Sequence, residues 1–257
     1  MTEPSSRPNA EVVAHGGASV QNLSNSLLAM ERALALAVDR IECDVQRSRD
    51  GDLVLVHDDR IRGPDGQRRP VRRLATAELR ACLPGLLLLD ELAEMAKGRT
   101  PLMIDVKGPG YEAELVETIR RHQLAALSSV SSTHAIALLR LHAAFPTMRM
   151  GLSTGHFAGS VPSRPGRRAV RAMLRTGLPL IIPLALRLTA ATETMIHHRV
   201  ASPRLIEAVH AAGKRVNLWT VDTEEDIRRA ISLRVDGIIS NRPEVVQRLI
   251  RESDSGR

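Results

Sequence analysis

Short apolar runs alternate along the chain with longer segments of helical periodicity. In segment 27–37 the apolar residues Leu27, Met30 and Leu34 recur near every 3.6 positions, and Glu31 lies on the opposite side. Such alternation of strands and helices is typical of parallel β/α units. The short runs predict nine strands, at residues 12–15, 40–45, 53–57, 102–106, 126–130, 148–152, 180–184, 216–221 and 237–240.

The number of strands favours one closed barrel. Eight of them form a (β/α)8 barrel if the run 53–57 returns antiparallel beside the run 40–45, through the turn at residues 49–52. An open doubly wound sheet is the alternative, but no GxGxxG motif follows the first strand. We therefore predict an α/β protein with a single TIM barrel over residues 11–250, between a disordered tail at 1–10 and a C-terminal tail at 251–257.

Composition narrows the classes of partner. The chain has 257 residues, with 36 basic and 29 acidic side chains, and its net charge of +7 favours anionic partners. We expect no nucleic acid among them, because one Trp, one Tyr and two Phe leave few rings on which bases could stack. No apolar run approaches the roughly 20 residues of a membrane-spanning helix, the polar N-terminus lacks a secretory signal, and two cysteines build no disulfide framework. A cytoplasmic location is therefore predicted, while the oligomeric state is left open.

Acidic and basic side chains occur where three of the predicted strands end. His15 ends the first strand, Glu42 and Asp44 lie two positions apart on the second, and Asp105 and Lys107 lie two apart on the next barrel strand. Residues two apart on a strand share a face, so each pair points to the same side. Carboxylates gathered at the mouth of a barrel repel one another unless a cation compensates them. An all-oxygen ligand set favours one divalent cation, Mg²⁺ or Ca²⁺, over Zn²⁺.

Two histidines complete a candidate catalytic set. His57 ends the run beside the second strand, and both it and His15 are expected at the same mouth. An acid and a base on either side of a phosphorus atom, with a cation and Lys107 near the non-bridging oxygens, suit the cleavage of a phosphodiester. Each signal alone is weak, but together they fall on the rim where this fold builds active sites.

The order and spacing of these residues resemble the glycerophosphodiester phosphodiesterase family, within the phosphatidylinositol-phospholipase-C-like phosphodiesterases, with this chain a divergent member. The motifs of that family correspond in this chain to the following segments: His15-Gly16-Gly17, Leu23-Ser24-Asn25-Ser26, Glu42-Cys43-Asp44-Val45, Arg49-Asp50-Gly51, His57-Asp58, Asp105-Val106-Lys107, Trp219-Thr220-Val221-Asp222 and Asp236-Gly237-Ile238 through Pro243.

The resemblance implies a metal-dependent barrel that hydrolyses a small-molecule glycerophosphodiester. It implies three metal ligands, Glu42, Asp44 and Asp105, and an acid/base pair, His15 and His57. It further implies that Lys107 contacts phosphate and that Trp219 forms a wall of the substrate pocket. Asn25 is a further candidate contact, although either it or Ser24 could instead cap the helix that follows.

Three departures from the family motifs keep other functions open. Gly16 replaces an arginine that resembles a phosphate clamp, Ser24 replaces a glutamate, and Asp105 replaces the third glutamate ligand, as in related sphingomyelinase D-like lipases that cyclise their substrate. Arginines of the segment 60–73 could replace the missing clamp, namely Arg60, Arg62, Arg68 or Arg69. The alternatives are therefore a cyclising phosphodiester lyase, a phosphodiesterase for another small molecule, a non-catalytic binder of phosphate esters, and a nucleic-acid binder suggested by charge alone.

Overall fold

A computed structural model describes residues 10–19, 23–63, 65–154 and 167–255. Eight parallel strands close into a barrel, because β1 pairs with β11 on one side and with β2 on the other. The predicted α/β fold with a single (β/α)8 barrel is confirmed. Around the barrel the strands are β1 (Glu11–Ala14), β2 (Arg40–Arg47), β6 (Leu102–Val106), β7 (Ser129–Ser132), β8 (Arg149–Ser153), β9 (Glu193–His197), β10 (Arg215–Trp219) and β11 (Gly237–Ser240).

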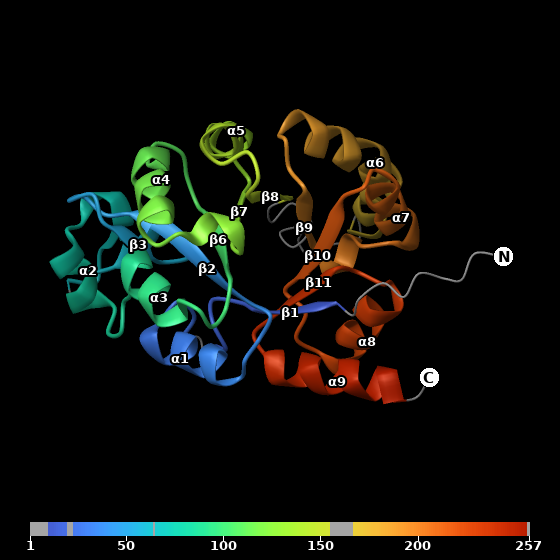
Figure 1. Ribbon diagram of the computed structural model, residues 1–257, viewed down its shortest axis with the longest axis horizontal. Coiled ribbons are helices and arrows are strands. Elements are labelled where there is room, and N and C mark those ends of the chain that lie inside the picture. Colours follow the sequence, from blue (N-terminus) through green and yellow to red (C-terminus); the bar gives the residue numbers. More distant parts are fainter. Residues whose placement is uncertain (1–9, 20–22, 64, 155–166, 256–257) are drawn as a thin grey trace.

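Helices form an outer layer around the strands (Figure 1). Their buried faces carry aliphatic residues at helical spacing, for example Met30 and Leu34 on the first helix and Ile227 and Ala230 on the eighth. Most of the core therefore lies between this layer and the sheet. Among the described residues, none of the helices has both the length and the apolar character needed to span a membrane. The helices are α1 (Leu27–Ala35), α2 (Thr76–Cys82), α3 (Leu89–Ala96), α4 (Glu112–Arg121), α5 (Ala135–Ala144), α6 (Arg167–Leu188), α7 (Pro203–Ala211), α8 (Glu224–Ser232) and α9 (Pro243–Ser255).

The segment after β2 builds a small subsidiary layer beside the barrel. Strand β3 (Leu53–Leu55) runs antiparallel to the end of β2, as predicted for the run 53–57. The basic segment that follows contains a hairpin of β4 (Arg60–Arg62) and β5 (Arg68–Pro70). Val54, Ile61, Val71 and Leu79 pack together beneath it in an apolar cluster of their own.

One predicted strand is wrong. Residues 180–184 belong to α6, in which Ile182 and Leu186 lie one turn apart and are both buried. A continuous apolar run does not distinguish a strand from a buried stretch of helix. The strand that occupies this place in the barrel is β9, which begins at Glu193, a residue that is unfavourable in a buried strand unless it is paired.

The C-terminal segment and one helix cap also differ from expectation. Helix α9 continues through Ser255, so the tail predicted from residue 251 is mostly helical; Glu252 is held there by ion pairs with Arg228 and Arg248. The tail predicted at 1–10 lies outside the described residues except for Ala10. The first helix is capped by Ser26, whose hydroxyl accepts from the Ala29 backbone N–H, and not by Ser24 or Asn25.

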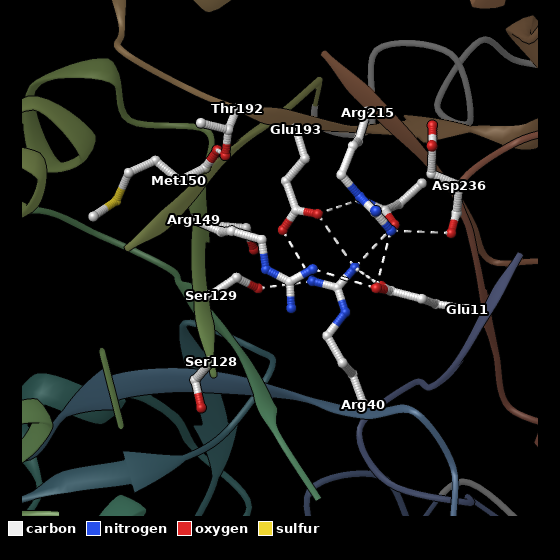
Figure 2. Close-up of polar contacts among 12 residues, drawn as sticks. Glu11, Arg40, Ser128, Ser129, Arg149, Met150, Thr192, Glu193, Arg215 and Asp236 are labelled. Atoms are coloured by element: carbon white, nitrogen blue, oxygen red, sulfur yellow. Dashed lines mark hydrogen bonds and ion pairs between the residues drawn. The ribbon is translucent and has the colours of Figure 1, made fainter. Parts of the chain in front are cut away.

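A buried polar network fills the end of the barrel where the strands begin. The Arg40 side chain is 1% exposed, and its guanidinium donates to both carboxylate oxygens of Glu193, at 3.0 and 3.2 Å. The same group donates to Ser129 at 2.9 Å and to Asn217 at 3.1 Å, and it pairs with Glu11 at 2.6 Å. Figure 2 shows Glu11, Arg40, Ser129 and Glu193 converging from separate strands. Because its polar groups pair with one another, this end is a structural plug, and the functional pocket lies at the opposite end.

Candidate active site

A cavity of about 270 Å³ opens where the parallel strands end. Seven of the eight predicted site residues line it, namely His15, Glu42, Asp44, His57, Asp105, Lys107 and Trp219. The eighth, Asn25, is buried and reaches the site through Asp44. These side chains are brought together from distant parts of the sequence because parallel strands end at the same rim of a barrel.

The three acidic residues form a compact cluster on two neighbouring strands. Asp44 on β2 lies in register with Asp105 on β6, and Glu42 is two residues before Asp44 on the same face. One carboxylate oxygen from each lies within 4.8 Å of the others. Between the aspartates lies the Lys107 ammonium, 2.5 Å from Asp44 Oδ1 and 2.6 Å from Asp105 Oδ2. Three carboxylates and one ammonium carry a net charge of −2 when ionised, which a divalent cation would balance.

Burial makes it energetically unfavourable for all three carboxylates to be ionised at once. Burial and the neighbouring Asp44 carboxylate raise the pKa of Glu42 well above its usual value. Burial also raises the pKa of Asp44, but the charges of Lys107 and His15 lower it further, so the net shift is downward. The pKa of Lys107 is raised, because Asp105 and Asp44 outweigh the effect of its burial. The chemistry of the three oxygen donors and the excess negative charge therefore fit a hard divalent cation.

Each carboxylate is oriented by a hydrogen bond from a different element. The backbone N–H of Gly16 donates to Glu42 Oε2 at 2.7 Å, and the Ser131 hydroxyl donates to Asp105 Oδ1 at 2.6 Å. Asn25 Nδ2 donates to Asp44 Oδ2 at 2.6 Å, while Asn25 Oδ1 accepts from the Asp44 backbone N–H at 2.9 Å. Asn25 thus holds a predicted ligand in place and does not line the cavity. Such supporting bonds fix the direction of the oxygens that bind a metal.

Two departures from the family motifs are neighbours in space. Gly16 has φ +55°, and a Cβ at this position would lie 2.7 Å from the Cβ of Ser24. A side chain at position 16 and the present position of Ser24 are therefore incompatible unless the backbone moves. The segments that hold Gly16 and Ser24 are in direct contact, since the Asn25 backbone N–H donates to the Gly16 carbonyl at 2.8 Å.

The arginines proposed as replacements for the clamp do not reach the pocket. Each is bound within the β4–β5 hairpin: Arg60 and Arg68 donate to each other's backbone carbonyls, Arg62 donates to the Gly66 carbonyl, and Arg69 pairs with Asp65. No arginine is among the described residues that line the cavity. The prediction that one of these four replaces the clamp is wrong for the structure as described.

His15 is held by a chain of hydrogen bonds on the far side of its ring. Its Nδ1 lies 2.8 Å from Asn241 Oδ1. Asn241 Nδ2 donates to Asp222 Oδ2 at 2.7 Å, and the Asn241 backbone N–H donates to Asp222 Oδ1 at 2.9 Å. Because a carboxylate only accepts, the amide nitrogen of Asn241 faces Asp222 and its oxygen faces His15. The Nδ1 of His15 therefore carries a proton, and in the neutral ring Nε2 is left as a proton acceptor.

His57 approaches the cavity from the loop after β3. Its Nδ1 lies 2.9 Å from Asp58 Oδ1, and its side chain is 42% exposed. The loop is fixed by Gln46, whose side-chain amide donates to the carbonyls of Val56 and Asp58 at 2.9 and 2.7 Å. On another side of the cavity Trp219 meets His197 edge-to-face, with ring centroids 5.1 Å apart. The two histidines His15 and His57 therefore line one pocket with different freedom, the first rigidly supported and the second partly exposed.

A comparison with protein families matches the model of the glycerophosphoryl diester phosphodiesterase family over residues 15–149 and 183–245. The chain belongs to this family. The resemblance to this family that the sequence motifs indicated is thereby confirmed. The prediction that the chain is a phosphoric diester hydrolase is confirmed as well.

Related proteins align with this chain over nearly its whole length. A glycerophosphodiester phosphodiesterase of Caldanaerobacter subterraneus is 27% identical over 94% of this chain and 98% of its own length. A solved glycerophosphodiester phosphodiesterase from Parabacteroides distasonis superposes with a TM-score of 0.77 at 21% identity, covering 96% of this chain and 99% of that one. An Oleispira antarctica phosphodiesterase in complex with the product sn-glycerol-3-phosphate superposes with a TM-score of 0.75 at 22% identity, covering 95% and 97%. At these identities the two structures establish the shared barrel.

The structure adds residues to the family site that the sequence analysis did not select. Asn241 supports His15, Ser131 orients Asp105, and His197 packs against Trp219. Asn241 and Ser131 also lie at the ends of barrel strands, the signal that selected the acidic residues, but they carry no charge. His197 ends β9, a strand that the sequence pattern did not predict, and it lies outside the matched motifs.

Proposed function

We propose that the chain is a metal-dependent phosphodiesterase that hydrolyses a small glycerophosphodiester by histidine acid/base catalysis. The observation that carries the proposal is the convergence of three carboxylates and two imidazoles on one cavity of about 270 Å³. The Oleispira relative with its bound product supports glycerol phosphate as half of the substrate. The cytoplasmic location inferred from the sequence stays a prediction.

The cation proposed for the site is Mg²⁺ or Ca²⁺, held by Glu42, Asp44 and Asp105. When bound, it supplies positive charge that stabilises a phosphate in the transition state. Lys107 now lies between Asp44 and Asp105, at 2.5 and 2.6 Å. We propose that, with a cation held by these carboxylates, the Lys107 ammonium would contact a phosphate oxygen. The lysine thus balances the acidic charge in one state and the substrate charge in the other.

His15 and His57 carry the proton transfers in this proposal. The Nε2 of His15 accepts a proton from water, because Asn241 keeps the proton of the neutral ring on Nδ1. The water oxygen bonds to phosphorus, the bond to the leaving alcohol breaks, and protonated His57 gives a proton to that alcohol. The products are a phosphate monoester and an alcohol. The exposure of His57 lets it regain a proton from solvent between turnovers.

The test is a panel of glycerophosphodiesters with different alcohol groups, assayed with Mg²⁺, with Ca²⁺ and with a chelator. We expect activity only with a divalent cation and a loss of at least about 100-fold in His15→Ala and Glu42→Ala. His142→Ala, on α5 and outside the cavity, is the matched control. Activity that survives both site substitutions, or that is insensitive to chelation, would overturn the proposal.

The shorter ligand Asp105 favours one second candidate, attack by a substrate hydroxyl in place of water. Phosphorus NMR of the product separates the two, since internal attack leaves a cyclic phosphate. Accumulation of only the cyclic product would replace hydrolysis by cyclisation. Phosphate-ester binding without turnover at any cation concentration would instead indicate a non-catalytic binder.

A further inference from the structure

Helix α6 differs from the rest of the molecule in charge. Its 22 residues include five arginines and no acidic residue. The surrounding segment 118–192 contains ten arginines and no Asp or Glu, whereas the remaining chain has 26 basic and 29 acidic residues. The positive net charge of the protein therefore comes from this one sector of the barrel.

Neighbouring elements neutralise only part of this charge. Arg121 pairs with Asp90 and Glu117, and Arg140 pairs with Glu112. These partners belong to α3 and α4, so the α4–α5 side of the sector is compensated. Within the described part of α6, Arg187 is exposed and forms no ion pair with a described carboxylate. Arg187 is therefore an exposed cation of α6 without a carboxylate partner in the described part of the chain.

The same helix exposes a stripe of large apolar side chains. Leu180, Ile181, Leu184 and Leu188 are exposed by 79%, 59%, 57% and 69%. At 3.6 residues per turn they fall within an arc of about 100°, and the buried Ile182 and Leu186 occupy the other side of the helix. Such clusters are uncommon on monomeric proteins and mark surfaces that bind something.

We propose that α6 docks the protein on an anionic lipid surface. A helix with an apolar stripe and no acidic residue is suited to lie in the interface of a bilayer, where the stripe enters the acyl boundary and the exposed Arg187 meets anionic headgroups. A second copy of the chain fits less well, because a symmetric contact through α6 would bring two helices of five arginines together.

The orientation of the helix leaves the active-site mouth accessible. Helix α6 leads to β9, so its C-terminal end, with Leu184 and Leu188, lies toward the end of the barrel where strands begin. Figure 1 shows α6 within the outer layer of helices, next to α7. Docking along this side leaves the cavity beside the bilayer and does not press it into the lipid. The exposed stripe is also separate from the catalytic residues, so docking and hydrolysis can be tested independently.

The test is co-sedimentation of the full chain with phosphatidylcholine vesicles, with and without phosphatidylglycerol. We expect binding to the phosphatidylglycerol vesicles that weakens as salt is raised. The double substitution L180Q/L184Q is expected to lower partitioning about tenfold or more, and R187Q about fivefold. The matched control is L27Q/L28Q on α1, which removes two leucines exposed by 39% and 62% and is expected to change partitioning by less than about twofold.

Activity on a water-soluble phosphodiester should be the same in all these variants, and circular dichroism checks that they fold. If L180Q/L184Q does not fold, R187Q is the test: a fivefold loss of vesicle partitioning supports the proposal, and unchanged partitioning contradicts it. Absence of vesicle binding at low salt, or equal binding by the α6 and α1 variants, would overturn the proposal. A different result would show that a second copy of the chain covers the stripe. In that case light scattering would find a dimer for the wild type and a monomer for L180Q/L184Q, and neither protein would bind vesicles.

Discussion

The hydrogen-bond chain behind His15 predicts that a substitution at Asp222, which does not line the cavity, changes the acid/base chemistry of the pocket. In the present arrangement Asp222 accepts two hydrogen bonds from Asn241, so the Asn241 oxygen must face His15 Nδ1. The substitution Asp222→Asn places an amide opposite the Asn241 amide. The Asn241 side chain can then turn over and offer its NH₂ group to Nδ1, which moves the proton of the neutral imidazole to Nε2. In that form Nε2 cannot accept a proton from water.

The size of the effect follows from the bonds involved. The 2.7 Å bond from Asn241 Nδ2 to Asp222 and the 2.8 Å contact to His15 together select one tautomer. The loss of one such part-buried bond, here to a charged carboxylate, costs about 1–3 kcal/mol. At about 1.4 kcal/mol per factor of ten, kcat/KM should fall about 5- to 150-fold in Asp222→Asn. The free energy of unfolding should change less than activity, because the side chain at position 222 retains an oxygen that can accept from the Asn241 backbone N–H and from Ser240.

The double variant D222N/N241D is the decisive control. It restores an acceptor beside Nδ1, because the carboxylate introduced at position 241 only accepts, and the amide introduced at position 222 can donate to it. We expect kcat/KM to recover to within about threefold of wild type. Initial rates on a glycerophosphodiester across pH, with thermal unfolding of each variant, provide the measurement. Full activity with an unchanged pH profile in Asp222→Asn would refute the tautomer argument, and an equally inactive double variant would show that the two residues have another role.

Three further outcomes are expected. Arg40→Ala leaves the buried Glu193 without its bidentate partner and should cost about 3–5 kcal/mol in urea unfolding; a cost under about 1 kcal/mol would contradict a structural role for the plug. Burial raises the pKa of Glu193, but Arg40 lowers it further, so the net shift is downward. The pair therefore stabilises the fold above the pKa of the unfolded chain, and this contribution is lost as the pH falls through the folded pKa. Acid unfolding should therefore depend less on pH in Glu193→Gln than in wild type, and an identical pH dependence of urea unfolding in the two proteins would contradict this account. Asn25→Ala frees Asp44 and should weaken divalent-cation binding about 10- to 100-fold by calorimetry, whereas unchanged affinity would mean that Asn25 serves the fold alone.

Much of the site was accessible from the sequence because its determinants are local. The predictions that selected Glu42, Asp44, Asp105 and Lys107 rest on two facts, that alternate residues of a strand share a face and that parallel strands end at one rim. Spacing within single strands is therefore enough to place these side chains in the same cavity. Asn25 shows the limit of this reasoning, because its contact with Asp44 depends on a loop conformation with φ 62° that no pattern indicated.

The sequence by itself determined the barrel, the acidic cluster and the two histidines, because periodicity and strand-end chemistry depend on neighbours along the chain. The tertiary structure alone decided the place of β9, the support of His15 and the failure of the hairpin arginines to reach the pocket. Glu193 is acceptable in a buried strand only since Arg40, 153 positions away, neutralises it. Likewise, Asn241 and His15 are 226 positions apart. The ion pair and the hydrogen bond form between residues that come into contact only when the barrel closes. No local sequence pattern can therefore predict them.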